Sequence, residues 1–78
     1  MAEIAYVLIQ TEAGKSAEVA QLVRSIDGVD TSDDVTGPYD VVVRIEAPSI
    51  DDVGRIVMRH IHLVEGITRT VTCSVMNP

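Results

Sequence analysis

The sequence has no tryptophan and no phenylalanine, and two tyrosines are its only aromatic residues. Its hydrophobic share is nevertheless 46%, so a core must be built mainly from Val, Ile, Leu and Ala. With 78 residues, the chain has room for one small domain. A core of that size supplies only about 3–5 kcal/mol of stability, and small domains therefore often rely on disulfides, metal ions or oligomerisation.

Cysteine is almost as scarce as the large aromatics. Cys73 is the single cysteine, which excludes an intramolecular disulfide and is typical of a reduced, cytoplasmic setting. Because Cys73 falls inside a predicted strand with no neighbouring base, we expect a buried, unreactive thiol. A cysteine-rich metal site is also missing from the sequence, so oligomerisation is the expected source of additional stability.

Long apolar runs and excess positive charge are absent too. The longest apolar run covers residues 4–9, which is too short to span a bilayer, and the first residues lack the basic start of a secretory signal. Twelve Asp and Glu residues oppose six Lys and Arg residues, which gives a net charge of −6. Such a chain repels phosphate backbones and anionic lipids, so we expect neither direct nucleic-acid binding nor a membrane partner.

Hydrophobic periodicity predicts the order strand, helix, strand, strand, helix, strand. Strands are expected at residues 3–11, 29–36, 40–47 and 67–76, and helices at residues 15–26 and 49–64. The second strand is polar and acidic, as is typical of a sheet edge. This order predicts a ferredoxin-like α+β fold, with both helices on one face of an antiparallel sheet and the first and third strands at its centre.

The two predicted central strands are apolar on both of their faces. The helices of this fold cover only one side of the sheet, so the second apolar side is left for another molecule. A second copy packed face to face would cover it, and burying about 1,500 Å² is ordinary for such a dimer. The sequence therefore predicts a homodimer.

The histidines and the acidic pairs do not form a recognisable metal or catalytic motif. His60 and His62 lie two residues apart on a predicted helix, where they would point in roughly opposite directions. His60 falls on the apolar stripe of that helix, so we expect it to be packed in the core or at an interface. No phosphate-binding loop or nucleophile motif is present. We therefore predict no catalytic residue, no metal site and no cofactor.

Two pairs of aspartates have simple structural interpretations. Asp51 and Asp52 follow Ser49 at the start of the second predicted helix, where a capping hydroxyl and acidic side chains are favourable. Asp33 and Asp34 lie on the predicted edge strand, where we expect them to be solvated. Neither pair has the ligand spacing of a calcium loop.

The segment Val-Thr-Gly-Pro-Tyr-Asp, residues 35–40, is the strongest candidate for a binding site. Gly37 would let a ligand approach the backbone, Tyr39 places an amphipathic ring on a connection, and Asp40 offers a fixed anion to an ammonium or amide group. The last strand adds a row of hydroxyls at Thr70 and Thr72 that both donate and accept. The same residues also form an ordinary turn and an ordinary strand, and the residues alone leave that alternative open.

The chain as a whole resembles the ligand-binding module of the Lrp/AsnC (feast/famine) transcriptional regulators, which is also called the RAM domain. The similarity is carried by three colinear segments, AYVLIQTEAGKSAEVAQLV, VTGPYDVVVRIEA and GITRTVTCSV. It implies a dimeric α/β sandwich (a dimeric α+β barrel) that assembles further into rings of tetramer to decamer size. It also implies a non-enzymatic role in which a small polar ligand, typically an amino acid, binds between dimers. Carried over by position, the ligand-binding residues are Thr36, Gly37, Tyr39, Asp40, Thr70 and Thr72.

Full-length members of that family also carry an N-terminal helix-turn-helix. We expect residues 1–78 to form a single ligand-binding and oligomerisation domain without a DNA-binding domain, which would co-assemble with full-length Lrp/AsnC regulators or act through protein contacts. Two other classes remain open. One is a small cofactor-free enzyme of the same sandwich architecture, a monooxygenase or isomerase, for which His60 is the candidate residue. The other is an ACT-like amino-acid-binding domain, which pairs its sheets side by side.

Overall fold

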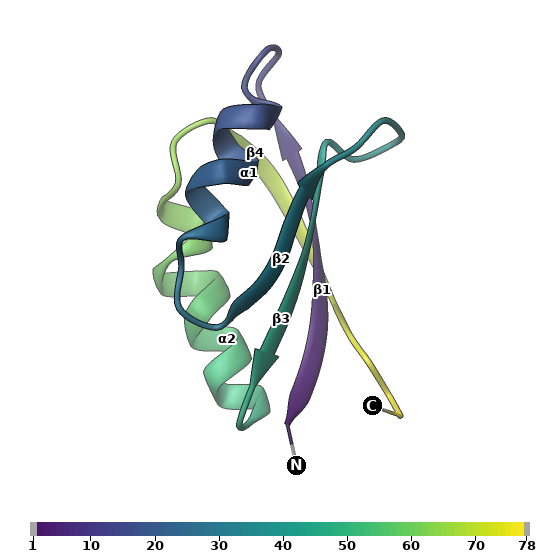
Figure 1. Ribbon diagram of the computed structural model, residues 1–78, viewed down its shortest axis with the longest axis vertical. Coiled ribbons are helices and arrows are strands. Elements are labelled where there is room, and N and C mark those ends of the chain that lie inside the picture. Colours follow the sequence, from purple (N-terminus) through teal and green to yellow (C-terminus); the bar gives the residue numbers. More distant parts are fainter. Residues whose placement is uncertain (1, 78) are drawn as a thin grey trace.

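The computed structural model describes residues 2–77, in which four strands form one antiparallel sheet with the order β2-β3-β1-β4. The elements are β1 (Glu3–Thr11), α1 (Ser16–Arg24), β2 (Val29–Asp34), β3 (Val41–Ala47), α2 (Ile50–Arg59), the short 3-10 turn η1 (Ile61–Leu63) and β4 (Ile67–Ser74). Both helices lie on one side of the sheet (Figure 1). The predicted ferredoxin-like α+β fold is confirmed, with β1 and β3 at its centre and the acidic β2 at one edge.

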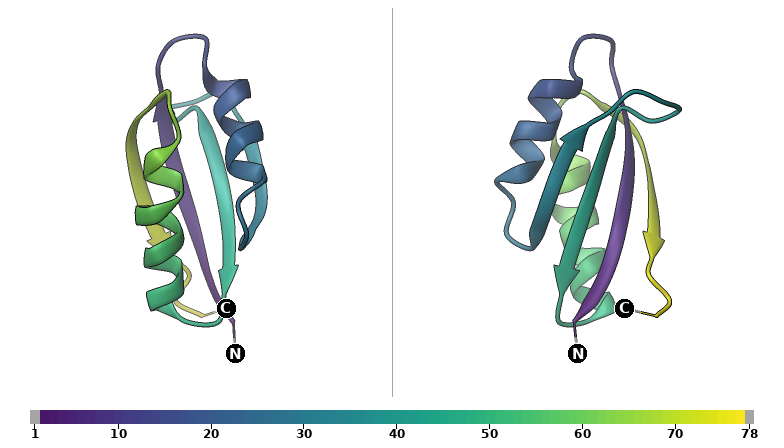
Figure 2. Two further views of the ribbon diagram at one scale, coloured as in Figure 1. Left: turned by 90° about the vertical axis from the view of Figure 1, so that its left-hand side faces the viewer. Right: turned by 45° about the vertical axis from the view of Figure 1, so that its right-hand side comes forward.

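The core lies between the sheet and the two helices. Alternate side chains of the central strands point into it, because successive residues of a strand face opposite sides. The side chains with 0% exposure are Ala5, Val7, Ile9, Val19, Val23, Val41, Val43, Ile45 and Ile61. The left view of Figure 2 shows α1 and α2 side by side over this face. None of the helices within residues 2–77 is long and apolar enough to cross a lipid bilayer.

The other side of the sheet is called the open face here, because no element among residues 2–77 covers it (Figure 2, right view). Strand register aligns its side chains in rows. Leu8 lies between Val42 on β3 and Val71 on β4, and Tyr6 lies between Arg44 on β3 and Cys73 on β4. Tyr6 is 40% exposed there. The prediction that β1 and β3 are apolar on both faces is confirmed for the row through Leu8, whereas Arg44 brings a charge into the next row.

The N-terminus of α2 is capped as the sequence predicts. The Ser49 hydroxyl oxygen accepts a hydrogen bond from the backbone N–H of Asp52 (3.2 Å) and donates one to the Asp52 carboxylate (2.9 Å). Arg55 pairs with the same carboxylate from one helical turn further on. The hydrogen bond from Ser49, followed by the one from Arg55, lowers the pKa of Asp52 below its usual value.

The second helix ends earlier than predicted, and this changes the position of His60. The backbone leaves the α region at His60, with φ −122° and ψ −58°, and continues as the 3-10 turn η1. His60 is therefore not packed in the core: its side chain is exposed, while the neighbouring Ile61 is buried. The alternative of a histidine at an interface between chains stays a prediction. The first helix likewise ends at Arg24, two residues short of the predicted end, and Leu22 is 47% exposed.

The prediction that Cys73 is buried is also wrong. Its thiol is exposed rather than buried, because Cys73 pairs with Tyr6 and so lies on the open face of the edge strand β4. The expectation of burial rested on the position of Cys73 within a strand and on the lack of a neighbouring base. The edge position and the uncovered face together leave this thiol accessible in the single chain.

Gly28, in the turn between α1 and β2, has a conformation that other residues rarely adopt. Its φ is +95°, and a Cβ added at this position would lie 2.5 Å from Cδ1 of Ile56. Its carbonyl oxygen also accepts a hydrogen bond from the backbone N–H of Glu46 (3.1 Å). Gly54 contrasts with it, because it lies within α2 and a Cβ there would meet no atom within 4 Å.

Alanine substitutions at these two glycines should therefore have opposite effects on the free energy of unfolding. Gly28→Ala should destabilise the domain by more than about 1 kcal/mol, since it adds strain at a positive φ and a clash with Ile56. Gly54→Ala should stabilise it by about 0.5–1 kcal/mol through higher helix propensity. Chemical denaturation of both variants measures this. Equal shifts would contradict the described backbone at Gly28.

Candidate ligand-binding site

The turn between β2 and β3 is tied to the central strand by its last residue. The backbone N–H of Asp40 donates to the carbonyl oxygen of Ile9 (2.8 Å), and the backbone N–H of Val35 donates to the carbonyl oxygen of Asp40 (2.8 Å). Between these bonds, residues 36–39 extend beyond the sheet as a loop (Figure 1). Open space lies beside Gly37, where an added Cβ would meet no atom within 4 Å.

The Asp40 carboxylate has one engaged oxygen and one available oxygen. Oδ2 accepts hydrogen bonds from the backbone N–H of Thr11 (2.8 Å) and from its hydroxyl (3.3 Å). None of the side-chain hydrogen bonds found among residues 2–77 uses Oδ1. Asp40 thus fastens the turn to the end of β1 and still has an acceptor for another group.

A hollow of about 410 Å³ lies beneath the turn, on the open face of the sheet. Its floor is formed by Leu8 and Val42, and its wall by the turn. The turn residues that line it are Val35, Thr36, Gly37, Pro38 and Tyr39. Three of the predicted ligand-binding residues, Thr36, Gly37 and Tyr39, are therefore brought together around one mainly apolar space. Asp40 follows Tyr39 in the chain but is not among the residues that line this space.

Thr70 and Thr72 lie on the opposite face of the sheet. Thr70 pairs with Ile9 and Thr72 pairs with Val7, and both of those β1 residues point toward the helices. Directly paired residues of an antiparallel sheet point to the same side, so the threonine hydroxyls face away from the hollow beneath the turn. Within one chain, the two groups of predicted residues are not brought together. One ligand could touch both groups only if they came from different chains.

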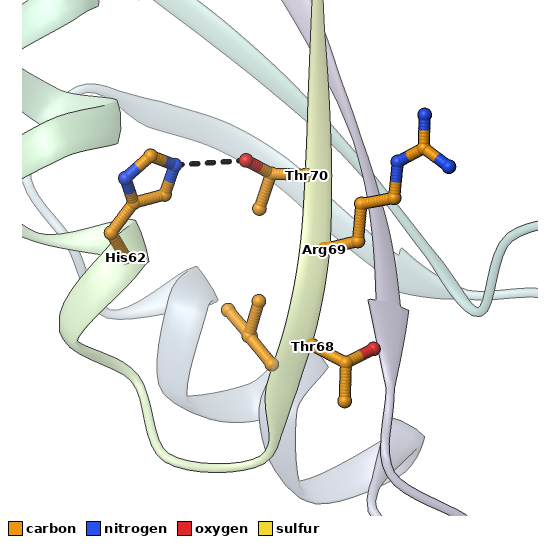
Figure 3. Close-up of a pocket in the computed structure, with 5 residues that line it drawn as sticks. His62, Thr68, Arg69 and Thr70 are labelled. Carbon is orange, nitrogen blue, oxygen red and sulfur yellow. Dashed lines mark hydrogen bonds between the residues drawn. The ribbon is translucent and has the colours of Figure 1, made fainter.

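His62 is a neighbour of Thr70 that the sequence interpretation did not connect with it. The His62 Nε2 lies 2.8 Å from the Thr70 hydroxyl oxygen, across a shallow hollow of about 290 Å³. Figure 3 shows these two side chains pointing toward each other, whereas Arg69 points to the other side of β4. No sequence pattern signals this contact, because it depends on the 3-10 turn η1 replacing the predicted helix.

Charged side chains at the β2 edge of the open face neutralise one another in part. The Arg44 guanidinium pairs with the Asp30 carboxylate and lies 3.9 Å from that of Glu46. Hydrogen bonds to Asp30 and then to Tyr6 raise the pKa of Arg44 further above its already high value. Among residues 2–77, no group of three or more His, Cys, Asp or Glu side chains is placed to hold a metal ion.

The sheet topology and the uncovered face define the class of protein as a small ferredoxin-like α+β domain. The family can also be identified. Residues 4–78 match the family model described as the Lrp/AsnC ligand binding domain, so the chain belongs to that family. The predicted resemblance is confirmed, and the family's regulatory character agrees with the expected class of function.

A curated relative and several solved structures extend this result. An uncharacterized HTH-type transcriptional regulator of Pyrococcus furiosus is 31% identical over 71 residues, which covers 87% of this chain and 47% of the relative. The chain thus spans about half the length of that regulator. TTHA0845 from Thermus thermophilus has a similar structure, with a TM-score of 0.91 and 25% identity, over 97% of this chain and 95% of that one.

Two further structures show the same fold. The hypothetical protein PHS023 from Pyrococcus horikoshii has a TM-score of 0.88 and 27% identity, over 100% of this chain and 93% of that chain. AsnC of E. coli has a TM-score of 0.88 at 21% identity, over 97% of this chain and 52% of that chain. The fold therefore occurs both as a chain of about this size and within a longer regulator.

The Asp40–Thr11 contact should contribute measurably to stability. Asp40→Ala removes a charged acceptor from the Thr11 N–H and hydroxyl, which should destabilise the domain by about 1.5–3 kcal/mol. Asp34→Ala is the matched control, because that carboxylate is exposed and should change stability by less than about 0.5 kcal/mol. Thermal or urea unfolding of both variants compares them. A similar cost for both would mean that Asp40 does not anchor the turn.

Proposed function

We propose that the chain is a non-enzymatic effector-binding and oligomerisation module that senses a small polar ligand, most simply an amino acid, in the cytoplasm. The observation that carries this proposal is the β2–β3 turn. It matches the ligand-loop motif that the sequence predicts, walls a hollow of about 410 Å³ and ends in a carboxylate with one available oxygen. Membership of a ligand-binding family supports the same reading.

The chemistry of the turn suits a zwitterionic ligand. Asp40 Oδ1 would accept a hydrogen bond from an ammonium or amide group, and the backbone around Gly37 and Tyr39 would shape the pocket. Thr70 and Thr72 would add hydroxyl hydrogen bonds from a neighbouring chain, because they face away from the hollow of their own chain. A regulator of this fold from Neisseria meningitidis, NMB0573, has been solved as a complex with L-Met (TM-score 0.80, 17% identity, 95% of this chain and 49% of that one).

Assembly follows from the uncovered open face. A homodimer formed face to face would bury Tyr6, Leu8, Val42 and Val71. Further association of dimers into a ring, from tetramer to decamer, would bring the turn of one dimer near the threonine row of another. Co-assembly with full-length regulators would link ligand binding to DNA, which this acidic chain is not expected to contact directly.

The enzyme alternative rests on His60 alone. This side chain is exposed after the end of α2, and it lines a hollow of about 330 Å³ together with Ile56 of α2 and Ala47 of β3. The space between the helices and the middle of the sheet is filled by aliphatic side chains such as Val7, Val43 and Val57. No second catalytic candidate from the sequence lies in that hollow, so we favour the binding role.

A thermal-shift screen of the twenty amino acids tests the ligand class. A ligand present at 100 times its dissociation constant adds about 2.7 kcal/mol of stability, which raises the melting temperature by several degrees. Asp40→Asn should then lower the affinity for the most stabilising amino acid by about tenfold to a hundredfold, because a charged acceptor becomes neutral. Calorimetric titration measures this. No stabilising amino acid would refute the ligand class, and unchanged affinity with a lower melting temperature would make Asp40 purely structural.

Adjacent valines of β3 test the assembly. Val43 is 0% exposed in the core, so Val43→Asp should unfold the domain at a cost of several kcal/mol. Val42 lies on the open face, so Val42→Asp should leave a folded monomer. Sedimentation with circular dichroism distinguishes these states. A wild-type protein that is monomeric at micromolar concentration would refute the proposed dimer.

A further inference from the structure

A shallow hollow lies at the β4 edge of the sheet, on the helix side and therefore opposite the hollow beneath the β2–β3 turn. Its volume is about 290 Å³, close to the lower end of the range of about 300–1,000 Å³ that is usual for ligand pockets. The residues that line it are His62, Ile67, Thr68, Arg69 and Thr70. Because β4 is an edge strand, a ligand or a neighbouring chain can reach this hollow from the side.

The 3-10 turn η1 holds His62 beside this hollow. Ile61 is 0% exposed in the core, and its carbonyl oxygen accepts a hydrogen bond from the backbone N–H of Val64 (3.0 Å). Successive residues of a 3-10 turn point about 120° apart, so burial of Ile61 directs His62 out of the core. The His62 Nε2 lies 2.8 Å from the Thr70 hydroxyl oxygen, and the two side chains point toward each other (Figure 3).

The imidazole determines what the Thr70 hydroxyl can offer to a ligand. A hydroxyl has one hydrogen to donate and two lone pairs, and a neutral imidazole has one N–H on either ring nitrogen. When His62 Nε2 carries the hydrogen, it donates to the Thr70 oxygen, and the Thr70 hydrogen is left for an outside acceptor. When Nε2 carries none, Thr70 donates to it and can only accept from a ligand. His62 Nδ1 takes part in none of the side-chain hydrogen bonds found among residues 2–77, so a bound ligand selects between the two arrangements.

A carboxylate is the acceptor that fits this pair. In the proposed function Asp40 takes the ammonium or amide group of the ligand, which leaves the carboxylate of an amino acid to be bound elsewhere. In a chain with a net charge of −6, a bound carboxylate needs a hydrogen-bond donor close to it. Arg69 is next to Thr70 in the chain, but its side chain points to the other side of β4 (Figure 3). The Thr70 hydroxyl, with a lone pair occupied by His62, is a donor that faces the hollow.

We propose that His62 is a positioning residue of the ligand site: its Nε2–H occupies a lone pair of the Thr70 oxygen, so that the Thr70 hydroxyl donates to the carboxylate of a bound amino acid. This inference rests on the proposed function and assigns the second end of its ligand. Asp40 of one chain binds the ammonium group, and Thr70 of another chain binds the carboxylate. The site therefore selects amino acids over the corresponding amides, which lack the carboxylate.

Pairs of ligands that differ only in this group test the assignment. Each of the twenty amino acids is compared with its α-carboxamide by thermal shift, and the most stabilising pair is titrated calorimetrically. The wild type should bind the acid about tenfold more tightly, because hydrogen bonds to charged acceptors are about twice as strong as those to neutral ones. His62→Leu should weaken binding of the acid by about three- to tenfold and change binding of the amide by less than about twofold. A merely structural role would weaken both equally.

Further variants separate this mechanism from its alternatives. His62→Gln restores an N–H donor and should bind the acid to within about twofold of the wild type. In a T70V background, H62L should have no further effect, because His62 acts through the Thr70 hydroxyl. His60→Leu is the matched control, since this exposed histidine lies close in the chain, lines a different hollow and should leave binding of the acid unchanged. Circular dichroism and the melting temperature establish that each variant is folded.

Each result decides a different point. The proposal is overturned if H62L weakens acid and amide alike, if it leaves binding of the acid unchanged, or if H60L causes the same loss. A further loss from H62L in the T70V background would also overturn it, because His62 would then act without Thr70. All of these outcomes leave the amino-acid ligand of the proposed function intact. The absence of any stabilising amino acid would instead refute that ligand class, and this inference with it.

Discussion

Two helices cover one face of a four-stranded sheet, whereas the central strands β1 and β3 carry apolar residues on both. The inner set of valines, isoleucines and alanines packs against the helices and forms the only substantial core among residues 2–77. The outer set, with Leu8 and Val42 at its centre, has no partner in the single chain. The lack of large aromatics makes that inner core modest, so the proposed homodimer through the outer face would add stability.

The candidate ligand site depends on the same face. Leu8 and Val42 form the floor of the hollow beneath the β2–β3 turn, and Asp40 holds that turn against Thr11 at the end of β1. A carboxylate that bonds the backbone through one oxygen is fixed in direction, so its second oxygen is presented in a defined place. The turn and the hollow therefore both depend on the register between β1 and β3. A change in that register would displace Asp40 from Thr11 and Leu8 from Val42.

The single chain holds the predicted site residues in two separate groups. The turn residues gather on the open face, while Thr70 and Thr72 point to the helix side, where His62 contacts Thr70. Successive side chains of β4 point to opposite faces of the sheet, so a change of rotamer cannot move the Thr70 and Thr72 hydroxyls to the open face. A site that uses both groups is necessarily shared between chains, so the proposed ligand binding would depend on oligomerisation.

The order of elements, the sheet centre and the cap of α2 can be predicted from the sequence, because each follows from local periodicity, chain connectivity or a Ser–Asp pair three residues apart. The sequence also determined the family, through residues spread over the whole chain. Tertiary packing sets which face each residue of β4 presents, and it places Cys73 in solvent and Thr70 and Thr72 on the helix side of the sheet. It also decided that His60 leaves the apolar stripe and that His62 meets Thr70. These outcomes depend on strand register and on the point at which a helix gives way to a 3-10 turn, and both are set by packing between segments far apart in the chain rather than by the residues next to them.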